Sequence, residues 1–338
     1  MFRYLQWLHL LTLSGNFWCP SRVSLGPTLF VIFINDLAIS LDCHRLFFAD
    51  DLNFFSSIDG VDDCIALHLQ LEAVNTWCNL NRLSLNISKC KVVSYTKRMH
   101  PLNFNYQLGS IIVAQNTETT DLGVVFDTKL RFHLHVEGKV KSAFKMLGFV
   151  MRTCRDISNM NCVILLYNVF VRSILEYACV VWNPIYKCHI DLLESVQRRF
   201  LKYLYFRTHR IYPPRGYPQV ELINEFNFMT LEARRSYFDM KFLIKFINNA
   251  IFIDKIYFKI TYVSNRVNSR HKQLFFTPYV KTNVLINSPL VRLYRLANSC
   301  YPILDASKIK LSEYNITIMR QLLESTGEHL DNEPISHL

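Results

Sequence analysis

Two adjacent carboxylates, Asp50 and Asp51, are the residues of this sequence best suited to chemistry. They stand between two apolar stretches, residues 46–48 and 52–55. Because aromatic residues favour strands and Asp tolerates turn geometry, the pattern predicts a tight β-hairpin with both carboxylates at its tip. Carboxylate oxygens suit Mg²⁺ or Mn²⁺, the ions that hold and polarise phosphates in two-metal phosphoryl transfer. An Asp-Asp pair is also common in turns that simply face water, so the surrounding elements must decide.

A second group of candidates is a basic stretch between Lys187 and Arg210. Six Lys and Arg residues stand there against two acids, with four aromatic residues interleaved. Basic side chains contact phosphates and aromatic rings stack on bases, so Arg198, Arg199 and Lys202 are predicted to bind nucleic acid. The alternative is a basic helix face that only meets water.

Composition favours a polyanionic partner. The chain has 338 residues, half of them apolar, and its 38 Lys and Arg exceed its 27 Asp and Glu, for a formal charge of +11. Such an excess favours nucleic acid or an acidic membrane surface. The ten cysteines form no C-x-x-C pair and do not bunch as in small secreted domains, so we expect neither zinc nor a disulfide framework. An intracellular location, in the cytoplasm or the nucleus, fits best.

Two apolar stretches raise the question of a membrane. Residues 1–18 begin like a signal peptide, but Gln6 and His9 interrupt them and no small-residue cleavage site follows. We expect an irregular start instead. Residues 162–182 are long enough to approach a span, yet they carry Arg172 and Glu176. Because charges inside a bilayer are costly, this stretch predicts a buried core helix and no stable membrane association.

The sequence predicts helices and strands before about His133 and long helices after it. A helix is predicted to open at Gly26-Pro27, and another to end near Asn81, with strands at 92–95, 110–113 and 122–126. The inner faces of the two helices comprise Phe30, Phe33, Ile34, Leu37 and Leu41, and Leu67, Leu71, Val74 and Cys78. This is an α+β arrangement, with helices backing an antiparallel sheet. After His133 long helices follow, including 162–182, one from about 189 and 231–247, and the breaker at 213–216 predicts a subdomain boundary.

In this order, the motifs resemble those of reverse transcriptases from LINE-type (non-LTR) retrotransposons, especially the jockey-like group. The resemblance extends over residues 20–250. It rests on Leu25-Gly26-Pro27-Thr28-Leu29-Phe30, Phe33-Ile34-Asn35-Asp36-Leu37, Phe48-Ala49-Asp50-Asp51, Trp77-Cys78, Leu85-Asn86 and Lys89, Asp121 to Asp127, and Leu175-Glu176-Tyr177 with Gln197-Arg198-Arg199. The segment around Leu122, Gly123 and Val124 is similar to the family's primer grip.

The resemblance implies a partial right-hand polymerase palm at 20–135, after an irregular segment at 1–19. A helical thumb-like region at 136–212 and a helical or mixed region at 213–338 would follow. The reaction would be template-directed addition of deoxynucleotides to a primer 3′-OH, with an RNA template, a DNA primer and Mg²⁺ or Mn²⁺. Asp50 would be the principal metal ligand and Asp51 its neighbour. Lys89 would lie near the triphosphate, or is simply an exposed lysine at a strand start.

Three departures from the family bear on activity. The family draws a further Asp from a strand upstream of the Gly-Pro helix, whereas residues 1–24 contain no Asp or Glu. The family's P-Q-G-S turn keeps only its proline in Pro20-Ser21-Arg22-Val23, and the fingers are expected to be absent. Because Mg²⁺ demands well-placed ligands, we expect weak metal binding and no polymerase activity by this chain alone. The alternatives are a non-catalytic RNA- or DNA-binding protein and a decayed transposon relic.

Overall fold

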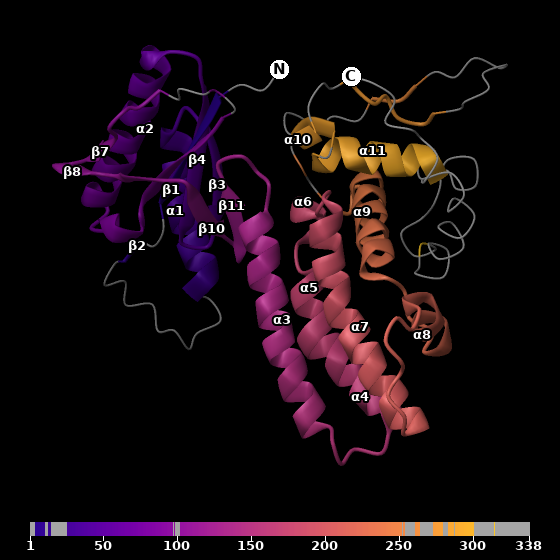
Figure 1. Ribbon diagram of the computed structural model, residues 1–338. Helices are drawn as coiled ribbons and strands as arrows, with labels where there is room; N and C mark the ends of the chain where they lie inside the picture. The colour runs from indigo at the N-terminus through magenta and orange to yellow at the C-terminus, as the bar shows by residue number, and fades with distance from the viewer. Residues whose placement is uncertain are drawn as a thin grey trace. The chain divides into compact units, whose positions relative to one another are not determined.

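The computed structural model describes residues 4–10, 13–14, 26–96, 98, 102–251, 253, 261–263, 273–279, 283–286, 288–300 and 314. The chain folds as two compact units, which divide between Arg131 and Phe132 (Figure 1). We call them the first unit and the second unit. The finer boundaries at 135/136 and 212/213 stay predictions.

A five-stranded sheet forms the first unit, in the order β3-β4-β1-β6-β9. Its strands are β1 (Tyr4–Leu10), β3 (His44–Phe48), β4 (Asp51–Ile58), β6 (Lys91–Tyr95) and β9 (Ala114–Asn116). All neighbouring strands are antiparallel except β6 and β9, which are parallel. The prediction of an antiparallel sheet therefore holds for every pair but this one. Residues 4–10, expected to be irregular, instead form the central strand, because β4 and β6 both hydrogen-bond to them.

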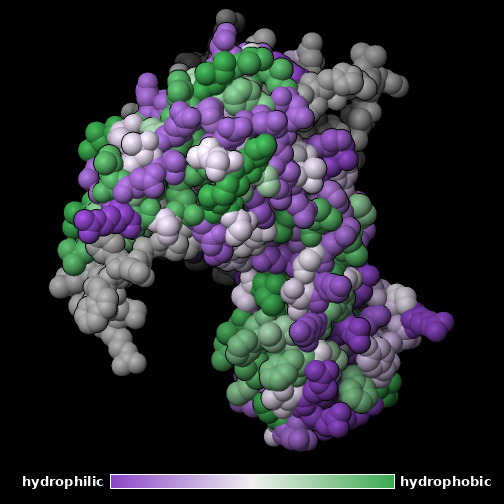
Figure 2. All heavy atoms as spheres, turned by 90° about the vertical axis from the view of Figure 1, so that its left-hand side faces the viewer, coloured by the Kyte–Doolittle hydropathy of each residue, from purple (hydrophilic) through white to green (hydrophobic). Residues whose placement is uncertain are grey.

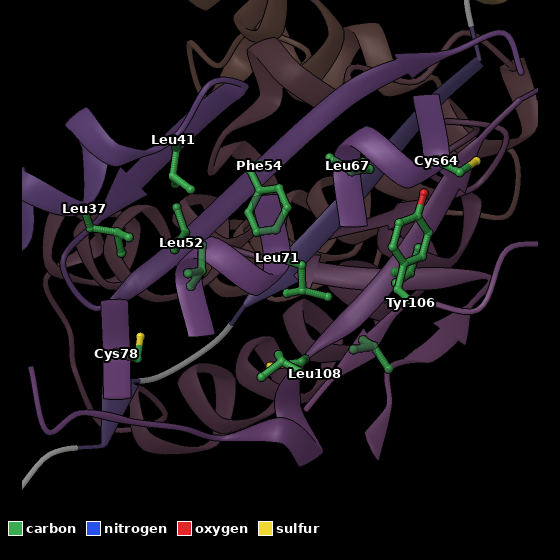
Figure 3. Close-up of a cluster of buried hydrophobic side chains, with 14 of the residues drawn as sticks. Leu37, Leu41, Leu52, Phe54, Cys64, Leu67, Leu71, Cys78, Tyr106 and Leu108 are labelled. Carbon is green, nitrogen blue, oxygen red and sulfur yellow. The ribbon is translucent and has the colours of Figure 1, made fainter. Parts of the chain in front are cut away.

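Two helices cover one face of this sheet: α1 (Gly26–Ser40) and α2 (Val61–Leu80). Helix α1 starts where the sequence predicts, and α2 ends at Leu80, next to the predicted Asn81, whose backbone amide donates to the Trp77 carbonyl over 3.0 Å. Their inner stripes meet Leu52 and Phe54 of β4 in a core that Figure 3 shows from within. The core is apolar, so β4 has one face fixed by burial and the other left for polar residues.

Short strands complete the first unit: β2 (Leu13–Ser14) with β5 (Ser84–Leu85), β7 (Gln107–Leu108) with β8 (Ile111–Ile112), and β10 (Glu118–Asp121) with β11 (Val124–Asp127). A 3₁₀ turn, Ile87–Lys89, precedes β6. The predicted strand at 122–126 is wrong at its start. Leu122 and Gly123 form the turn of the β10–β11 hairpin with φ values of 44° and 77°, and the left-handed region at that turn ends a strand.

The second unit is helical. Its elements are α3 (His133–Thr153), α4 (Met160–Tyr167), a π-helix (Asn168–Arg172), α5 (Ser173–Glu176), α6 (Cys179–Trp182), α7 (Lys187–His209), α8 (Gln219–Glu225), α9 (Leu231–Ile247), α10 (Asn283–Ile286) and α11 (Pro289–Cys300). The prediction of helix 231–247 is confirmed, and α7 buries Leu193, Val196, Phe200 and Leu204.

The single helix predicted at 162–182 is wrong. The chain turns at Tyr177 and Ala178, where Ala178 has a φ of 53°, and α6 then begins. The indole nitrogen of Trp182 donates to the Tyr177 carbonyl over 2.7 Å, which satisfies a backbone oxygen that the break leaves without a helical partner.

Among the residues that the structure describes, no helix has the length and apolar character needed to cross a membrane.

Candidate active site

The predicted Asp50-Asp51 hairpin is present, with one change of detail. Strands β3 and β4 pair from His44 to Phe48, and the two-residue turn consists of Ala49 and Asp50. Ala49 has a φ of 53°, the positive value that two-residue hairpin turns require. Only Asp50 therefore lies at the tip. Asp51 opens β4 opposite Phe48, and both carboxylates are partly exposed.

Alternation along β4 decides which way the catalytic candidates face. Leu52 and Phe54 are buried beneath the helices, so Asp51 and Asn53 lie on the second face of the sheet, opposite α1 and α2. Asn53 is 5% exposed, and its Nδ2 donates to Oδ2 of Asp121 over 3.4 Å. The predicted primer-grip hairpin thus reaches the same sheet face as Asp51.

One buried carboxylate fixes the turn that follows the β10–β11 hairpin. Asp127, 8% exposed, accepts backbone hydrogen bonds from Lys129 over 3.0 Å and from Arg131 over 2.9 Å. Burial, with Asp121 and Asp127 nearby, raises the pKa of the Tyr95 phenol. Of the predicted primer-grip residues, Leu122 and Gly123 form the exposed turn and Val124 is buried at 3% exposure.

Asn53 and Tyr95 belong to this site, and sequence reasoning missed them. Side chains alternate between the two faces of a strand, so residue 53 of β4 lies on the same face as residue 51. This pattern could have predicted Asn53 as a residue of the site. Tyr95 offers no such signal, because its neighbours come from a hairpin some thirty residues further along the chain.

Lys89 lies at the same end of the sheet as the two aspartates. Across the central strand, Asn53 of β4 pairs with His9 of β1, and His9 pairs with Lys91 of β6. Asp51 and Lys89 each lie two residues beyond that row, and strands two apart are separated by about 10 Å. Lys89 is exposed at the end of the 3₁₀ turn.

The strand beside the hairpin contains no acid. Strand β1 precedes α1 in the chain and pairs with β4 as far as Leu10 opposite Leu52, and its sequence is YLQWLHL. The oxygens of Asp50 and Asp51 are donors of the kind that Mg²⁺ uses. Among the described residues, however, no three His, Cys, Asp or Glu side chains gather closely enough to hold a metal ion.

The predicted nucleic-acid-binding residues all lie on α7, but their side chains do not all point the same way. Arg198 Nε donates to Oε1 of Gln219 in α8 over 2.7 Å. The guanidinium of Arg199 instead lies over the Phe144 ring of α3, 5.9 Å from its centroid. Lys202 is partly buried. Arg198 and Arg199 therefore contact different neighbouring helices, α8 and α3.

One further arginine of the same basic stretch has a structural role. Arg207 Nη1 donates to the Cys154 carbonyl over 2.7 Å and to the Tyr203 hydroxyl over 2.8 Å. It thereby satisfies a carbonyl at the C-terminal end of α3.

Comparison with known proteins agrees with the hairpin and the sheet. Residues 18–151 match the family model of reverse transcriptases, described as RNA-dependent DNA polymerases. With its Asp-Asp hairpin on a mixed sheet and helix layer, this part of the chain is a polymerase palm region.

Two curated relatives place the region more closely. The chain is 24% identical over 209 residues to the RNA-directed DNA polymerase from mobile element jockey of Drosophila funebris, which covers 57% of this chain and 23% of that protein. It is 36% identical over 92 residues to an uncharacterized protein of Caenorhabditis elegans, covering 27% of this chain and 46% of the other. The chain thus spans less than half the length of either relative. No solved structure matches it. The chain contains a reverse transcriptase region of the LINE type.

Proposed function

We propose that this chain is the palm and thumb-like part of a LINE-type reverse transcriptase, an RNA-directed DNA polymerase. The observation that carries the proposal is the Asp50-Asp51 hairpin, which lies inside the matched region and presents partly exposed carboxylates beside the β10–β11 hairpin. The second unit follows directly and is helical, which supports a thumb-like role for α3 to α7. An RNA template and a DNA primer are the proposed partners.

Each site residue has a proposed role. Asp50 and Asp51 would hold the divalent ion, which supplies charge neutralisation for the reacting phosphates. Lys89, at the same end of the sheet, would approach the triphosphate as a cation. The turn at Leu122 and Gly123 would approach the primer strand, because Gly123 has no side chain and lets a nucleic-acid backbone come close.

We further propose that this centre is inactive in this chain. In the family that the motifs resemble, a strand before the Gly-Pro helix adds a third carboxylate, and β1 occupies such a place without one. Two carboxylates leave more of the coordination shell to water, so divalent metal should bind weakly.

Primer extension tests the activity. The 338-residue chain is incubated with a DNA primer on an RNA template, deoxynucleotides and either Mg²⁺ or Mn²⁺, beside an active reverse transcriptase as a positive control. We expect no extension. Extension that disappears in Asp50→Ala would show that the two carboxylates suffice and would overturn the proposed inactivity.

Metal binding tests the site without relying on activity. Titration with Mn²⁺, followed by electron paramagnetic resonance of the free ion, should show weak binding that is lost in an Asp50→Asn, Asp51→Asn double variant. Asp62→Asn is the matched control, because Asp62 is an exposed acid of the same unit in the first turn of α2. Equal Mn²⁺ binding by both variants would contradict the assignment.

A second candidate function is non-catalytic binding of nucleic acid, favoured by the formal charge of +11. A gel shift on an RNA–DNA hybrid at several salt concentrations separates the two candidates. Binding with no metal-dependent chemistry supports this function. If an Arg199→Gln, Lys202→Gln variant keeps the wild-type affinity and salt slope, these residues of α7 are not part of the binding surface.

A further inference from the structure

Helix α2 is apolar on two sides, and only one of them packs into the core of the first unit. Its inner stripe is buried against the sheet. On the outer side, Val61, Ile65 and Leu69 are 54%, 45% and 55% exposed. Their spacing of four residues places them along one side of the helix, over about 12 Å of its axis. Because a helix that is apolar all round is normally buried, the outer stripe indicates a surface that a partner covers.

The β7–β8 hairpin widens this stripe. The backbone amide of Gln107 in β7 donates to Nδ1 of His68 over 3.5 Å, so the hairpin lies against α2 (Figure 1). Ile112, which pairs with Gln107, is 56% exposed, and its neighbour Ile111 is 49% exposed. Single exposed aliphatic residues are ordinary, but several on two adjoining elements form the kind of patch that marks an interaction site. We call this set the α2–β8 apolar surface: Val61, Ile65, Leu69, Ile111 and Ile112.

The charges around this surface are negative, although the whole chain has a formal charge of +11. Residues 59–80 contain four acids and no Lys or Arg. Asp62 is exposed three residues before Ile65, and Glu72 is exposed three residues after Leu69, so both adjoin the stripe. Among the residues that the structure describes, no ion pair involves Asp62. Glu72 lies 3.5 Å from His68 and its side chain is still 59% exposed.

We propose that the α2–β8 apolar surface docks a protein partner that presents a basic amphipathic helix. Side chains four residues apart form a ridge, and such a ridge packs into the groove of a second helix. The apolar side of the partner helix would cover Ile65 and Leu69. Lys or Arg residues beside that apolar side would reach Asp62 and Glu72, whereas the phosphates of nucleic acid or of an anionic lipid would be repelled.

The docking surface is separate from the candidate active site. It belongs to the helix layer of the first unit, whereas Asp51 lies on the opposite face of the sheet. A docked helix therefore leaves the carboxylates open to other ligands. The inference does not depend on polymerase activity, and its tests need none.

A peptide of known pattern tests the docking. The probe is a labelled amphipathic helix of about 18 residues, or five turns, with leucine on one side and lysine on the other. The matched peptide replaces every lysine with glutamate. Binding of each to the full chain is followed by fluorescence anisotropy at several salt concentrations.

We expect the lysine peptide to bind at least about 10-fold more tightly than the glutamate peptide, with an affinity that falls as the salt concentration rises. The net positive charge of the chain works against this preference, so non-specific attraction predicts the reverse order. Equal binding of the two peptides, or no saturable binding of the lysine peptide, would overturn the proposal.

Apolar substitutions locate the site. The double variant Ile65→Gln, Leu69→Gln removes the ridge and keeps the helix, because glutamine is a good helix former. We expect it to bind the lysine peptide at least about 10-fold more weakly, since two side chains lose their burial. The matched control is Leu29→Gln, Ile39→Gln, at two aliphatic residues of α1 that are 56% and 83% exposed. Equal losses in the two variants would place the peptide elsewhere and contradict the docking site.

Charge substitutions test the choice of a basic partner. Asp62→Asn with Glu72→Gln should weaken binding of the lysine peptide several-fold and flatten its salt dependence. Asp156→Asn with Asp191→Asn, at two exposed acids of the second unit, should leave both unchanged. If the first variant keeps the wild-type affinity and salt dependence, the acids do not select the partner and a basic helix is the wrong occupant.

Two further measurements separate the remaining occupants. Hydrogen–deuterium exchange with saturating lysine peptide should become slower in α2 and β8, and protection confined to the second unit would contradict the site. Light scattering gives the oligomeric state of the chain without peptide. A dimer that Ile65→Gln, Leu69→Gln converts to a monomer would make a second copy the occupant and would overturn the basic helix. None of these outcomes changes the expected primer extension or Mn²⁺ binding, so failure here leaves the proposed function standing.

Discussion

The two units of this chain differ in the charged residues that they bury: among the described residues, the first unit buries Asp127 alone, whereas the second buries a group that includes Glu194, Arg235 and Asp239. In the first unit the core beneath α1 and α2 is built from apolar side chains with Cys and Tyr, and the carboxylates of interest stay partly exposed at the hairpin. In the second unit charged residues lie in the interior: Glu194, Arg235 and Asp239 are 6%, 1% and 1% exposed.

The interior charges of the second unit bind its helices to one another. Glu194 of α7 accepts from the Glu232 amide over 2.9 Å. Asp239 of α9 accepts from Asn183 over 3.1 Å and from Arg292 of α11 over 2.7 Å. Arg235 Nε donates to Oδ1 of Asn183 over 2.9 Å. Burial raises the pKa of both acids and lowers that of Arg235, while the opposite charges around them act against it.

The contrast teaches which charges are available for chemistry. A carboxylate enclosed by arginine and amide donors has no room for a metal ion or a phosphate. A carboxylate in a partly exposed turn can exchange water for either. The chemical candidates therefore belong to the first unit, while the second unit offers an external basic surface and an internal ionic network that holds its helices.

Hydrophobic patches lie among hydrophilic residues on the surface that Figure 2 shows. Exposed apolar residues gather on the outer side of α1, where Leu29, Ile32 and Ile39 are 56%, 64% and 83% exposed. Helix α1 is thus apolar on both sides, whereas the exposed residues of α3 are mostly polar or charged, apart from Leu134 and Phe149.

Breaking the interior ionic network should have the largest effect. Arg235→Met removes the cation and leaves Glu194 and Asp239 less compensated, so we expect the second unit to lose about 3–5 kcal/mol. Urea unfolding gives the total, and hydrogen–deuterium exchange shows which unit opens. Arg198→Met, which removes one exposed hydrogen bond, should cost less than about 1.5 kcal/mol. Equal losses would mean that the network does not support the second unit.

A substitution in the apolar core of the first unit should lower the free energy of unfolding by a similar amount. Phe54 is fully buried among α1 and α2, and Phe54→Ala should cost about 3–5 kcal/mol, from lost burial and the cavity it leaves. Hydrogen exchange should speed up in the first unit only. Phe170→Ala, at a side chain 46% exposed, serves as control. Faster exchange in both units would contradict their separate cores.

A pH dependence distinguishes the units further. Burial, with Lys139 nearby, lowers the pKa of His135 to about 4. Because the folded state holds this imidazole neutral, its contribution is fully present above the ordinary pKa of about 6.5. It is lost as the pH falls towards 4, by up to about 3 kcal/mol.

Chemical unfolding at pH 7 and at pH 4.5 tests this dependence. His135→Phe should lose less stability over that interval than the wild type. His44→Phe, at an exposed position of the first unit, should keep the wild-type difference. An unchanged difference in His135→Phe would show that another group carries the effect.

A helix cap gives the smallest effect. Thr230 Oγ1 accepts from the Ala233 amide over 3.1 Å at the start of α9. Thr230→Ala should cost the second unit about 1 kcal/mol. Ser236→Ala, within the same helix, should be nearly neutral, and thermal unfolding of both variants measures the difference. If the two variants melt together, the cap does not stabilise α9.

Local patterns alone were enough for much of this protein. The apolar periodicity of residues 30–41, 67–78 and 231–247 predicts helices α1, α2 and α9, because burial of one stripe is a property of neighbouring residues. Alternation and turn chemistry predict the hairpin around Asp50 and Asp51, and the order of the motifs indicates a reverse transcriptase region. The signals for the helices and the hairpin each lie within fewer than twenty residues, whereas the order of the motifs extends over residues 20–250.

Contacts between distant segments decided the rest. Whether residues 4–10 become a strand depends on free edges of β4 and β6, which lie some forty to ninety residues away. The placement of Asp121 beside Asn53, the different neighbours of Arg198 and Arg199 and the burial of Arg235 likewise depend on which helix or hairpin packs against each side chain. The sequence of a charged residue is the same whether the side chain is exposed to water or buried against a partner. Only the tertiary structure distinguishes these two environments.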